Sequence, residues 1–322
     1  MSSTFQKTYL EPVNSLLTNG IFYVLQTIDG ESPGSSIINA RPPQTKSMPP
    51  EPETQYAEAF TLETALAHLK GDDAGLRFYA AWWFGKFKIN HPEATQLLIA
   101  ALEDDRDRTP EGGYPLRRNA ARALGKLSDL SAVEPLIAAL TCPDRYVVEG
   151  AAQSLETLGD PRAIEPLVHL LSKGLCIADT TTQLSPDQPD NTQPYDSILE
   201  ALGTLTATAF INQIKPFLQH PTPRIDYAAH RAMYQITGEN QYGDRLITAL
   251  NGPDLQLRRA ALMDIGAIGY LPAAEAIALT LAENSLKLIS MKGVLEYQLN
   301  AHPDGPRSPD AIRVMDLMDS ML

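Results

Sequence analysis

The chain has 322 residues, 43% of them hydrophobic, and a formal net charge of −13 at pH 7. This length can bury a large core, and the acidic charge argues against nucleic-acid binding, because phosphate contacts need clustered Lys and Arg. No apolar run is long enough to cross a bilayer, and Cys142 and Cys176 lack zinc spacing, which favours a reduced, cytoplasmic chain without a metal site.

Residues 1–55 differ in composition from the rest of the chain. They contain the Pro-rich segment RPPQTKSMPPEPE and one short apolar run, GIFYVLQTI. We therefore expect a flexible N-terminal extension. Met48 is a second possible start, because it opens a short polar leader that runs directly into the first helix. The intact mass of the native protein distinguishes the two starts.

Residues 56–300 repeat one pattern. LRRNAARALG (116–125) and LQLRRAALMDIG (255–266) are two copies of a string that recurs about every 31 residues, apart from two insertions. A second amphipathic run follows each copy, as in AVEPLIAALTC (132–142), with helical apolar spacing and Pro-Asp or Gly-Asp-Pro turns between runs. The Ala-Ala pairs permit close helix approach. The pattern predicts an all-α, HEAT-like α-solenoid of about six helical hairpins.

Two insertions and the C-terminus depart from the period. The first insertion, EDDRDRTPEGGY (103–114), carries Arg106 and Arg108, and the second covers 172–194. We expect both to be polar loops, where such scaffolds often carry function. Residues 301–322 read as a linker and an amphipathic helix that either caps the final repeat or meets a partner.

The repeats resemble a known family. FYAAWWFGKF (78–87), GGYPLRRNAARALGKL (112–127) and DLQLRRAALMDIGAIGYLPAAEAIA (254–278) are similar to the E-type subunits of phycocyanin alpha-subunit phycocyanobilin lyases. The likeness covers about Thr61 to Leu295. It implies a HEAT-like solenoid that pairs with a homologous F-type subunit in the cytoplasm of a phycobilisome-containing cell. Together they attach phycocyanobilin to a cysteine of the phycocyanin alpha chain, so the bilin is a substrate and no cofactor is permanently bound.

That reaction adds a thiolate across the ethylidene double bond of the bilin. The nucleophile belongs to the acceptor protein, so the lyase needs only to hold the flexible tetrapyrrole and present one face of it. Cations for the propionates, aromatic rings for the pyrroles and a carboxylate for the pyrrole N–H groups would serve this purpose.

Two arginine pairs, Arg117–Arg118 and Arg258–Arg259, are candidates for the propionates. Adjacent helical residues point about 100° apart, so one member can brace the scaffold while the other faces the ligand. For Arg117 and Arg258 the alternative is an Asp–Arg ladder between repeats, which Asp254, four residues before Arg258, supports. For Arg118 and Arg259 the alternative is a solvated surface.

The aromatic candidates are Trp82, Trp83 and Tyr79. The two neighbouring tryptophans cannot share one narrow stripe, so we expect one to pack in the core and the other to be available for stacking on the bilin. Core packing of both is the alternative. Tyr79 shares part of their face, while capping and packing explain Tyr114 and Tyr146.

Asp264 and His230 are the candidates for proton chemistry. Asp264 could accept pyrrole N–H bonds, with a salt bridge to Arg258 or Arg259 as the alternative. His230 could act as an acid or base, with an ordinary surface or core position as the alternative. Transient bilin attachment to either cysteine is not expected.

The residues alone leave three functions possible. They are a bilin lyase subunit acting on phycocyanin or phycoerythrocyanin alpha chains, a non-catalytic scaffold for phycobiliproteins, and a subunit for bilin transfer or detachment. The residues alone support a HEAT-type binding module, and only the resemblance implies a lyase.

Overall fold

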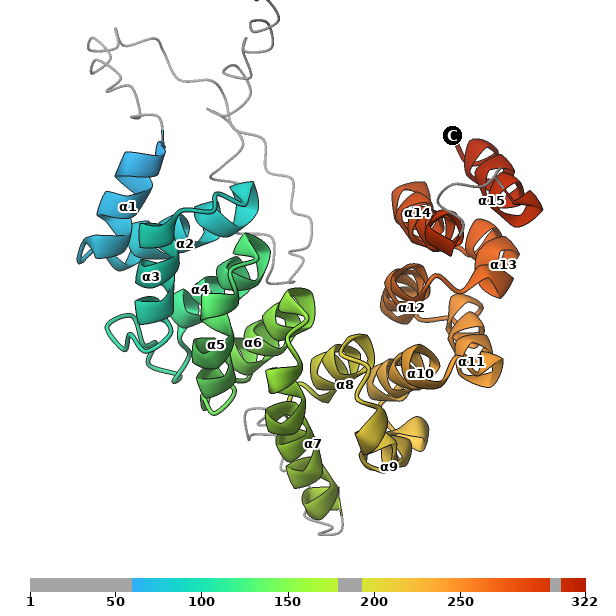
Figure 1. Cartoon of the computed structure of the whole chain (residues 1–322), viewed down its shortest axis with the longest axis horizontal. Helices are drawn as coiled ribbons and strands as arrows, with labels where there is room; N and C mark the ends of the chain where they lie inside the picture. Colours follow the sequence, from blue (N-terminus) through green and yellow to red (C-terminus); the bar gives the residue numbers. More distant parts are fainter. Residues whose placement is uncertain (1–59, 179–192, 302–307) are drawn as a thin grey trace, which may run out of the picture. The chain divides into compact units, whose positions relative to one another are not determined.

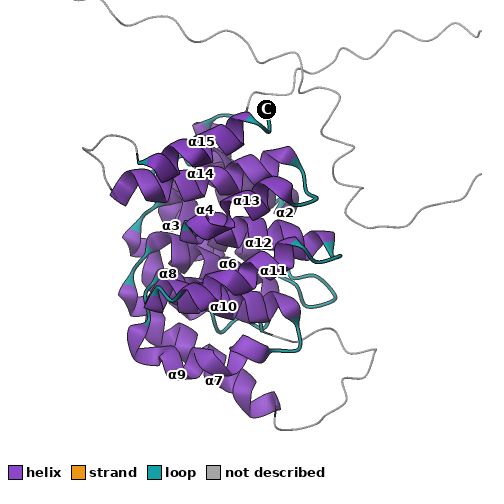
Figure 2. Ribbon diagram, turned by 90° about the vertical axis from the view of Figure 1, so that its right-hand side faces the viewer, coloured by secondary structure: helices purple, strands orange, loops and turns teal. Residues whose placement is uncertain are grey.

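The computed structural model describes residues 60–178, 193–301 and 308–322 (Figure 1). The predicted extension at 1–55 and most of the second insertion lie outside the described residues. Within these residues there are fifteen α-helices, five short 3-10 helices and no strand (Figure 2). The all-α prediction is confirmed.

The helices form two rows. In the first row, each helix packs against the next one along the chain (Figure 1). This row contains α2 (Ala74–Phe87), α4 (Pro115–Leu127), α6 (Arg145–Leu158), α8 (Tyr195–Thr204), α10 (Pro223–Thr237), α12 (Leu255–Ile268) and α14 (Asn284–Ala301). The predicted solenoid is therefore confirmed, with seven first-row helices in the described part of the chain.

Helices of the second row pack against the first-row helix that follows them. This row contains α1 (Leu62–Lys70), α3 (Pro92–Ala101), α5 (Val133–Ala139), α7 (Ile164–Ala178), α9 (Ile211–Ile214), α11 (Asn240–Leu250) and α13 (Ala274–Leu279). The last helix, α15 (Pro309–Asp319), packs against α13 and α14 instead. It buries Ala311 and Val314, so it caps the final repeat.

Capping residues start and stop these helices where the turn signals predict. Asp144 Oδ1 accepts the Tyr146 N–H at 2.9 Å, and Asp254 Oδ1 accepts the Gln256 N–H at 2.7 Å. These bonds satisfy first-turn amides that have no partner within the helix. At its other end, α6 stops at Gly159 with φ 69°, a left-handed conformation that suits glycine.

Small residues set the spacing of the first row. Ala120 and Ala121 on α4 and Ala151 and Ala152 on α6 are fully buried or nearly so. The predicted close approach of these helices is confirmed at Gly125, because a Cβ there would lie 2.4 Å from Ser154 Oγ. The distance between α4 and α6 therefore leaves no room for a side chain at Gly125.

Two segments differ from the sequence prediction. The run QIKPFLQH is not one α-helix: α9 ends at Ile214 and a 3-10 helix covers Lys215–Gln219. Pro216 lacks the N–H that an α-helix needs and clashes with the preceding turn, which explains the change. In the other segment, α7 continues to Ala178, into the predicted loop 172–194, because no proline stops it earlier.

Candidate functional site

The two tryptophans of α2 lie on different sides of the helix. Trp83 is only 9% exposed and packs against Phe84 and Phe87, whereas Trp82 is 42% exposed. The ring of Tyr79, itself about a third exposed, lies 5.3 Å from that of Trp82, centroid to centroid. The expected division into one core and one exposed tryptophan is confirmed, and Trp82 and Tyr79 form an exposed aromatic surface.

Polar contacts cross one side of the first row. Arg122 on α4 donates to Glu149 on α6 at 3.1 Å. Gln153, one turn further along α6, donates to Glu149 at 3.4 Å and contacts Ser197 on α8 at 3.5 Å. Three consecutive first-row helices therefore turn these side chains to a common side.

The same side continues over α10. Thr204 on α8 donates to Glu156 on α6 at 2.8 Å, and Gln235 on α10 donates to Thr204 at 3.2 Å. We call this side of the first row the ladder face. It is defined by the contacting residues Arg122, Glu149, Gln153, Glu156, Ser197, Thr204 and Gln235.

Trp82 also belongs to the ladder face. Gly85 and Gly125 are matching positions, because each presses its helix against the next first-row helix. Trp82 precedes Gly85 by three residues, as Arg122 precedes Gly125. Trp82 on α2 therefore occupies the position that Arg122 occupies on α4.

Arg117 braces the scaffold. Its Nε donates to the carbonyl of Asp104 at 3.1 Å and its Nη2 to the carbonyl of Glu103 at 3.0 Å, and it also pairs with Asp105. The guanidinium covers the ring of Tyr114, with Cζ 4.2 Å from the centroid. The predicted Asp–Arg bracing is confirmed here, and it fastens the first insertion to α4.

Arg118 contacts an aromatic ring but no acid. Its Cζ lies 4.3 Å from the ring centroid of Tyr146, which is 46% exposed. Its Nε is buried and finds no hydrogen-bond acceptor, and no carboxylate in the described part of the chain pairs with it. Since it precedes Arg122 by one turn, it points to the ladder face. This cation remains available for an anionic ligand.

Arg258 joins two turns. It donates to the carbonyl of Gly252 at 2.6 Å and to that of Leu281 at 3.0 Å. The expected pairing with Asp254 is wrong, because that carboxylate caps α12 through the N–H groups of Gln256 and Leu257. Arg258 therefore braces the scaffold as predicted, but its partners are backbone carbonyls and not a carboxylate.

Arg259 is paired rather than free. It forms a two-pronged ion pair with Glu283, in which Nε lies 3.1 Å from Oε2. The hydrogen bond from Arg259 lowers the pKa of Glu283 to about 2. Arg259 is therefore a paired surface side chain, about a third exposed, and its role as a propionate ligand stays a prediction.

Asp264 does not pair with either arginine of α12. It is 1% exposed and contacts Arg224 at 2.5 Å and Arg231 at 3.2 Å, both on α10. At about 100° per residue, positions five and six residues apart point roughly 120–140° apart around a helix, so Arg258 and Arg259 point elsewhere. The expected salt bridge is therefore wrong, and burial leaves Asp264 little surface for a ligand.

Asp264 instead belongs to a carboxylate–arginine cluster on the ladder face. Arg231 also contacts Glu156 at 2.5 Å and Glu200 at 3.1 Å, while Arg224 contacts Glu200 and lies 3.5 Å from Asp196. The cluster consists of Glu156, Asp196, Glu200, Arg224, Arg231 and Asp264. Sequence reasoning missed all of these except Asp264, although Arg224 and Arg231 are seven residues apart, which places them on one helix side.

Glu200 is the titratable centre of this cluster. Burial raises its pKa to about 7, against the opposing charge of Arg224, and Asp264 pushes it in the same direction as burial. Glu200 contacts both arginines of the cluster. It therefore holds a proton at a pH where an ordinary glutamate has lost it.

His230 lies away from this cluster. Its Nδ1 is 2.8 Å from the carbonyl of Asp226 and 3.2 Å from that residue's carboxylate. Its ring meets Tyr242 of α11 at 6.0 Å, and Arg245 of α11 also pairs with Asp226. The structure thus places His230 at the contact with α11 and does not bring it together with Asp264.

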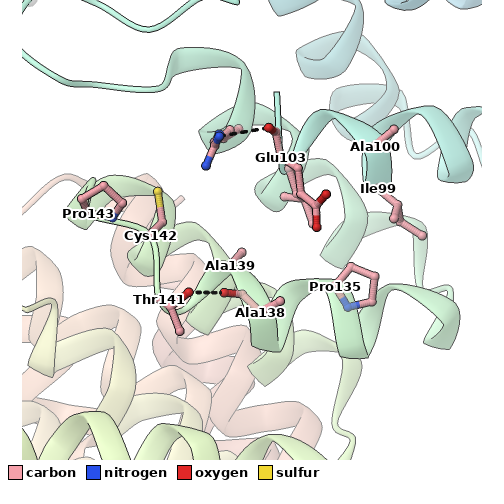
Figure 3. A pocket seen from close by; sticks show the side chains of 11 residues that line it. Ile99, Ala100, Glu103, Pro135, Ala138, Ala139, Thr141, Cys142 and Pro143 are labelled. Carbon is pink, nitrogen blue, oxygen red and sulfur yellow. Dashed lines mark hydrogen bonds between the residues drawn. The ribbon is translucent and has the colours of Figure 1, made fainter. Parts of the chain in front are cut away.

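The first insertion is ordered and borders a cavity. Arg106 pairs with Asp104 and Asp72, and Arg108 lies 5.7 Å from the ring centroid of Tyr114. A cavity of about 530 Å³ lies between α3 and α5. Figure 3 shows Cys142 beside it. It is lined by Ile99, Ala100, Leu102, Glu103, Arg117, Pro135, Ala138, Ala139, Thr141, Cys142 and Pro143. The side chain of Cys176 lies outside the described part.

No group of three or more His, Cys, Asp or Glu side chains in the described ranges is placed to hold a metal ion. None of the described helices is long and apolar enough to span a bilayer.

Known proteins identify the repeats. Residues 76–104 match a family model described as PBS lyase HEAT-like repeat, and residues 113–174 match one for HEAT repeats. The chain is 61% identical over 267 residues to the phycocyanobilin lyase subunit alpha of Microchaete diplosiphon, covering 81% of this chain and 90% of that relative. The chain belongs to the phycocyanobilin lyase alpha-subunit family.

Other relatives agree with this membership. The lyase subunit alpha of a Picosynechococcus species is 54% identical over 83% of this chain and 98% of its own. A bilin biosynthesis protein, PecE, from a Nostoc species is 44% identical over 74% of this chain and 87% of its own. Among solved structures, the complex of CpcE and CpcF of phycocyanin lyase from Nostoc matches with a TM-score of 0.75 and 52% identity, over 87% of this chain and 100% of that one.

Proposed function

We propose that this chain is one subunit of a heterodimeric lyase that attaches phycocyanobilin to a cysteine of the phycocyanin alpha chain. The observation that carries the proposal is 61% identity over nine-tenths of a phycocyanobilin lyase alpha subunit. The match to CpcE in its complex with CpcF supports an F-type subunit as the partner. The bilin is the substrate, no cofactor is permanently bound, and the reaction takes place in the cytoplasm.

The reaction forms a thioether. The sulfur of the acceptor cysteine bonds to the exocyclic carbon of the ethylidene group, the C=C π bond breaks, and the neighbouring ring carbon takes a proton. The acceptor supplies the nucleophile, so this chain contributes binding and orientation. Holding reactants in one geometry can supply a large part of the rate enhancement of such an addition.

The ladder face between α2 and α6 is the proposed bilin-binding surface. Arg118 offers a guanidinium without a carboxylate partner, which suits a propionate. Trp82 and Tyr79 offer exposed rings for stacking on pyrroles. Tyr146 keeps the Arg118 guanidinium in place from the side of α6. This surface thus combines a fixed cation with flat apolar contacts.

Arg117, Arg258 and Trp83 have structural roles in this proposal. Arg117 and Arg258 donate hydrogen bonds to backbone carbonyls in turns, and Trp83 is buried in the core. Arg259 takes the position of Arg118 in its own repeat, but Glu283 already neutralises it. Of the two arginine pairs, Arg118 alone is proposed to bind bilin.

Phycocyanin is the preferred acceptor over phycoerythrocyanin. The solved complex whose matching chain is 52% identical to this chain is that of a phycocyanin lyase. A non-catalytic scaffold and a subunit for bilin transfer or detachment are the remaining alternatives, and the following experiment distinguishes them.

The test is co-expression of this chain with an F-type subunit, apo-phycocyanin alpha chain and phycocyanobilin. Covalent bilin is read by fluorescence after electrophoresis in acid and urea. A lyase gives covalent product that requires both subunits. Product no greater than spontaneous addition would contradict the proposal and leave the scaffold. Loss of bilin from pre-loaded phycocyanin would indicate detachment.

A further inference from the structure

The carboxylate–arginine cluster carries more acid than base. Its four carboxyl groups outnumber its two guanidinium groups, so the cluster carries a net charge of −2 when all are ionised. Glu200 is the carboxyl that lies between the two cations, since one oxygen meets Arg224 and the other lies 3.1 Å from Arg231. An excess of buried acid is relieved when one carboxyl holds a proton.

The cluster is not fully enclosed between the helices, and not all of its polar atoms are paired. Arg231 is more than nine-tenths buried, yet its Nε has no hydrogen-bond acceptor in the described part of the chain. At the outer edge, Arg224 and Asp196 keep roughly a quarter to a third of their side chains exposed. The cluster therefore has an unfilled polar position inside and an open side on the ladder face.

The proposed addition requires a proton donor from this chain. While sulfur bonds to the exocyclic carbon, the ring carbon must gain a proton, and the thiol loses its own. No oxidant or reductant takes part. A neutral carboxyl beside two guanidinium groups suits this step, because the anion left after donation is stabilised by both cations.

The position of Glu200 also fits the proposed binding surface. Glu200 is on α8 and Arg118 on α4, two steps along the first row, and neighbouring helix axes lie about 8–10 Å apart. A tetrapyrrole whose central propionates meet Arg118 can extend an end ring over α6 toward α8. Glu149 and Gln153 on α6 lie along this path on the same face.

We propose that Glu200 donates the proton that bilin addition places on the ring carbon, and that Asp264 positions the two arginines around it. This rests on the lyase function proposed above. After donation, Glu200 is restored by the proton that the acceptor thiol releases, so the cycle consumes no net proton. Glu200 is preferred to Asp264 because it is 8% exposed, against 1% for Asp264.

The test compares Glu200→Gln and Glu200→Asp with a control, Glu134→Gln, on the second-row helix α5, where Glu134 pairs with Arg162. Each full chain is assayed with its F-type partner, apo-phycocyanin alpha chain and phycocyanobilin. Two quantities are measured between pH 5.5 and pH 8.5: the affinity for bilin without the acceptor, and the single-turnover rate of covalent attachment.

We expect Glu200→Gln to lower the attachment rate about 100-fold, the usual loss for a removed general acid, with bilin affinity unchanged. Glu200→Asp should recover part of the rate with a displaced pH profile, and Glu134→Gln should behave as the wild type. A wild-type rate and pH profile for Glu200→Gln would overturn the inference. Weakened bilin binding with a normal rate once saturated would also overturn it. Absence of attachment by the wild-type pair would contradict the lyase function instead.

Discussion

Arg118 and Tyr146 stack across the contact between α4 and α6, with the guanidinium carbon 4.3 Å from the ring centroid. The stacking fixes a cation that no described carboxylate neutralises. Its neighbour Arg117 points about 100° away and is fully engaged by the first insertion. We therefore expect Arg118 to bind the bilin and Arg117 to brace the scaffold, and variants of each residue test these roles.

Replacing Arg118 by Ala should weaken bilin binding without unfolding the protein. A charge-assisted hydrogen bond to a propionate contributes roughly 1.5–3 kcal/mol, which corresponds to about a 10- to 100-fold loss of affinity. Binding is measured by the absorbance of added phycocyanobilin. Arg259→Ala is the control and should bind normally, because that side chain already pairs with Glu283. Equal affinities for wild type and Arg118→Ala would exclude Arg118 from the site.

Replacing Arg117 by Ala should destabilise the protein. The change removes hydrogen bonds to two backbone carbonyls and the cover over Tyr114, and we expect a loss of roughly 2–3 kcal/mol. The free energy of unfolding is measured by urea denaturation. Arg118→Ala, whose guanidinium makes no ion pair within the described ranges, should change it by less than about 1 kcal/mol. Similar losses for both variants would contradict the division of roles.

The two tryptophans should respond in opposite ways to truncation. Trp83→Ala opens a cavity among Phe60, Phe84 and Phe87 and should cost about 3–5 kcal/mol of stability. Trp82→Ala should cost about 1 kcal/mol or less but weaken bilin binding, because its ring is exposed on the ladder face. Denaturation and bilin titration of both variants separate the effects. Normal bilin binding by Trp82→Ala would exclude stacking on that ring.

The stability of the protein should fall as pH rises from about 4.5 to about 7, because in this range the unfolded Glu200 loses its proton while the folded one keeps it. An unfolded glutamate releases its proton near its model value of 4.5, whereas folded Glu200 keeps it to about pH 7. The folded state therefore binds more protons in this window, and the unfolding free energy decreases between those pH values and stays reduced above them. Glu200→Gln does not titrate, so its melting temperature should exceed that of the wild type at pH 8.5 and match it at pH 5. An equal difference in melting temperature between Glu200→Gln and the wild type at both pH values would contradict the raised pKa of Glu200.

Adding a single methyl group should disturb the packing between repeats. A Cβ at Gly125 would meet Ser154 Oγ at 2.4 Å and its Cα at 2.7 Å, so Gly125→Ala should cost about 1–3 kcal/mol. The matched control is Gly75→Ala, near the start of α2, where only the Asp73 side chain lies close, at 3.3 Å. There alanine should stabilise the helix by up to about 1 kcal/mol. Thermal melts compare the two, and a stable Gly125→Ala would mean that the helices can separate.

The repeat period, the turn caps and the exposed tryptophan could be predicted from sequence, because they depend on residues close together in the chain. Asp254 shows the limit of this reasoning. Its spacing from Arg258 suggests an ion pair, yet an aspartate at the start of a helix gains more by capping its free N–H groups.

The partners of Asp264 could not be found in the same way. Its contacts come from Arg224 and Arg231, 40 and 33 residues earlier, and only the packing of α10 on α12 brings them together. Spacing within one helix would have excluded the wrong partners, since positions five and six residues apart diverge widely. The right partners required knowledge of which helices are neighbours and how each is rotated.

One contact of Arg231 reaches past the adjacent helix. From α10 it bonds to Glu156 on α6, across the intervening α8, at 2.5 Å. Repeat arrays ordinarily couple only to their nearest neighbours, so their modules can open one at a time. This longer-range tie makes α6, α8 and α10 a single cooperative block, and amide hydrogens in these three helices should exchange together and more slowly than those of α1 or α15.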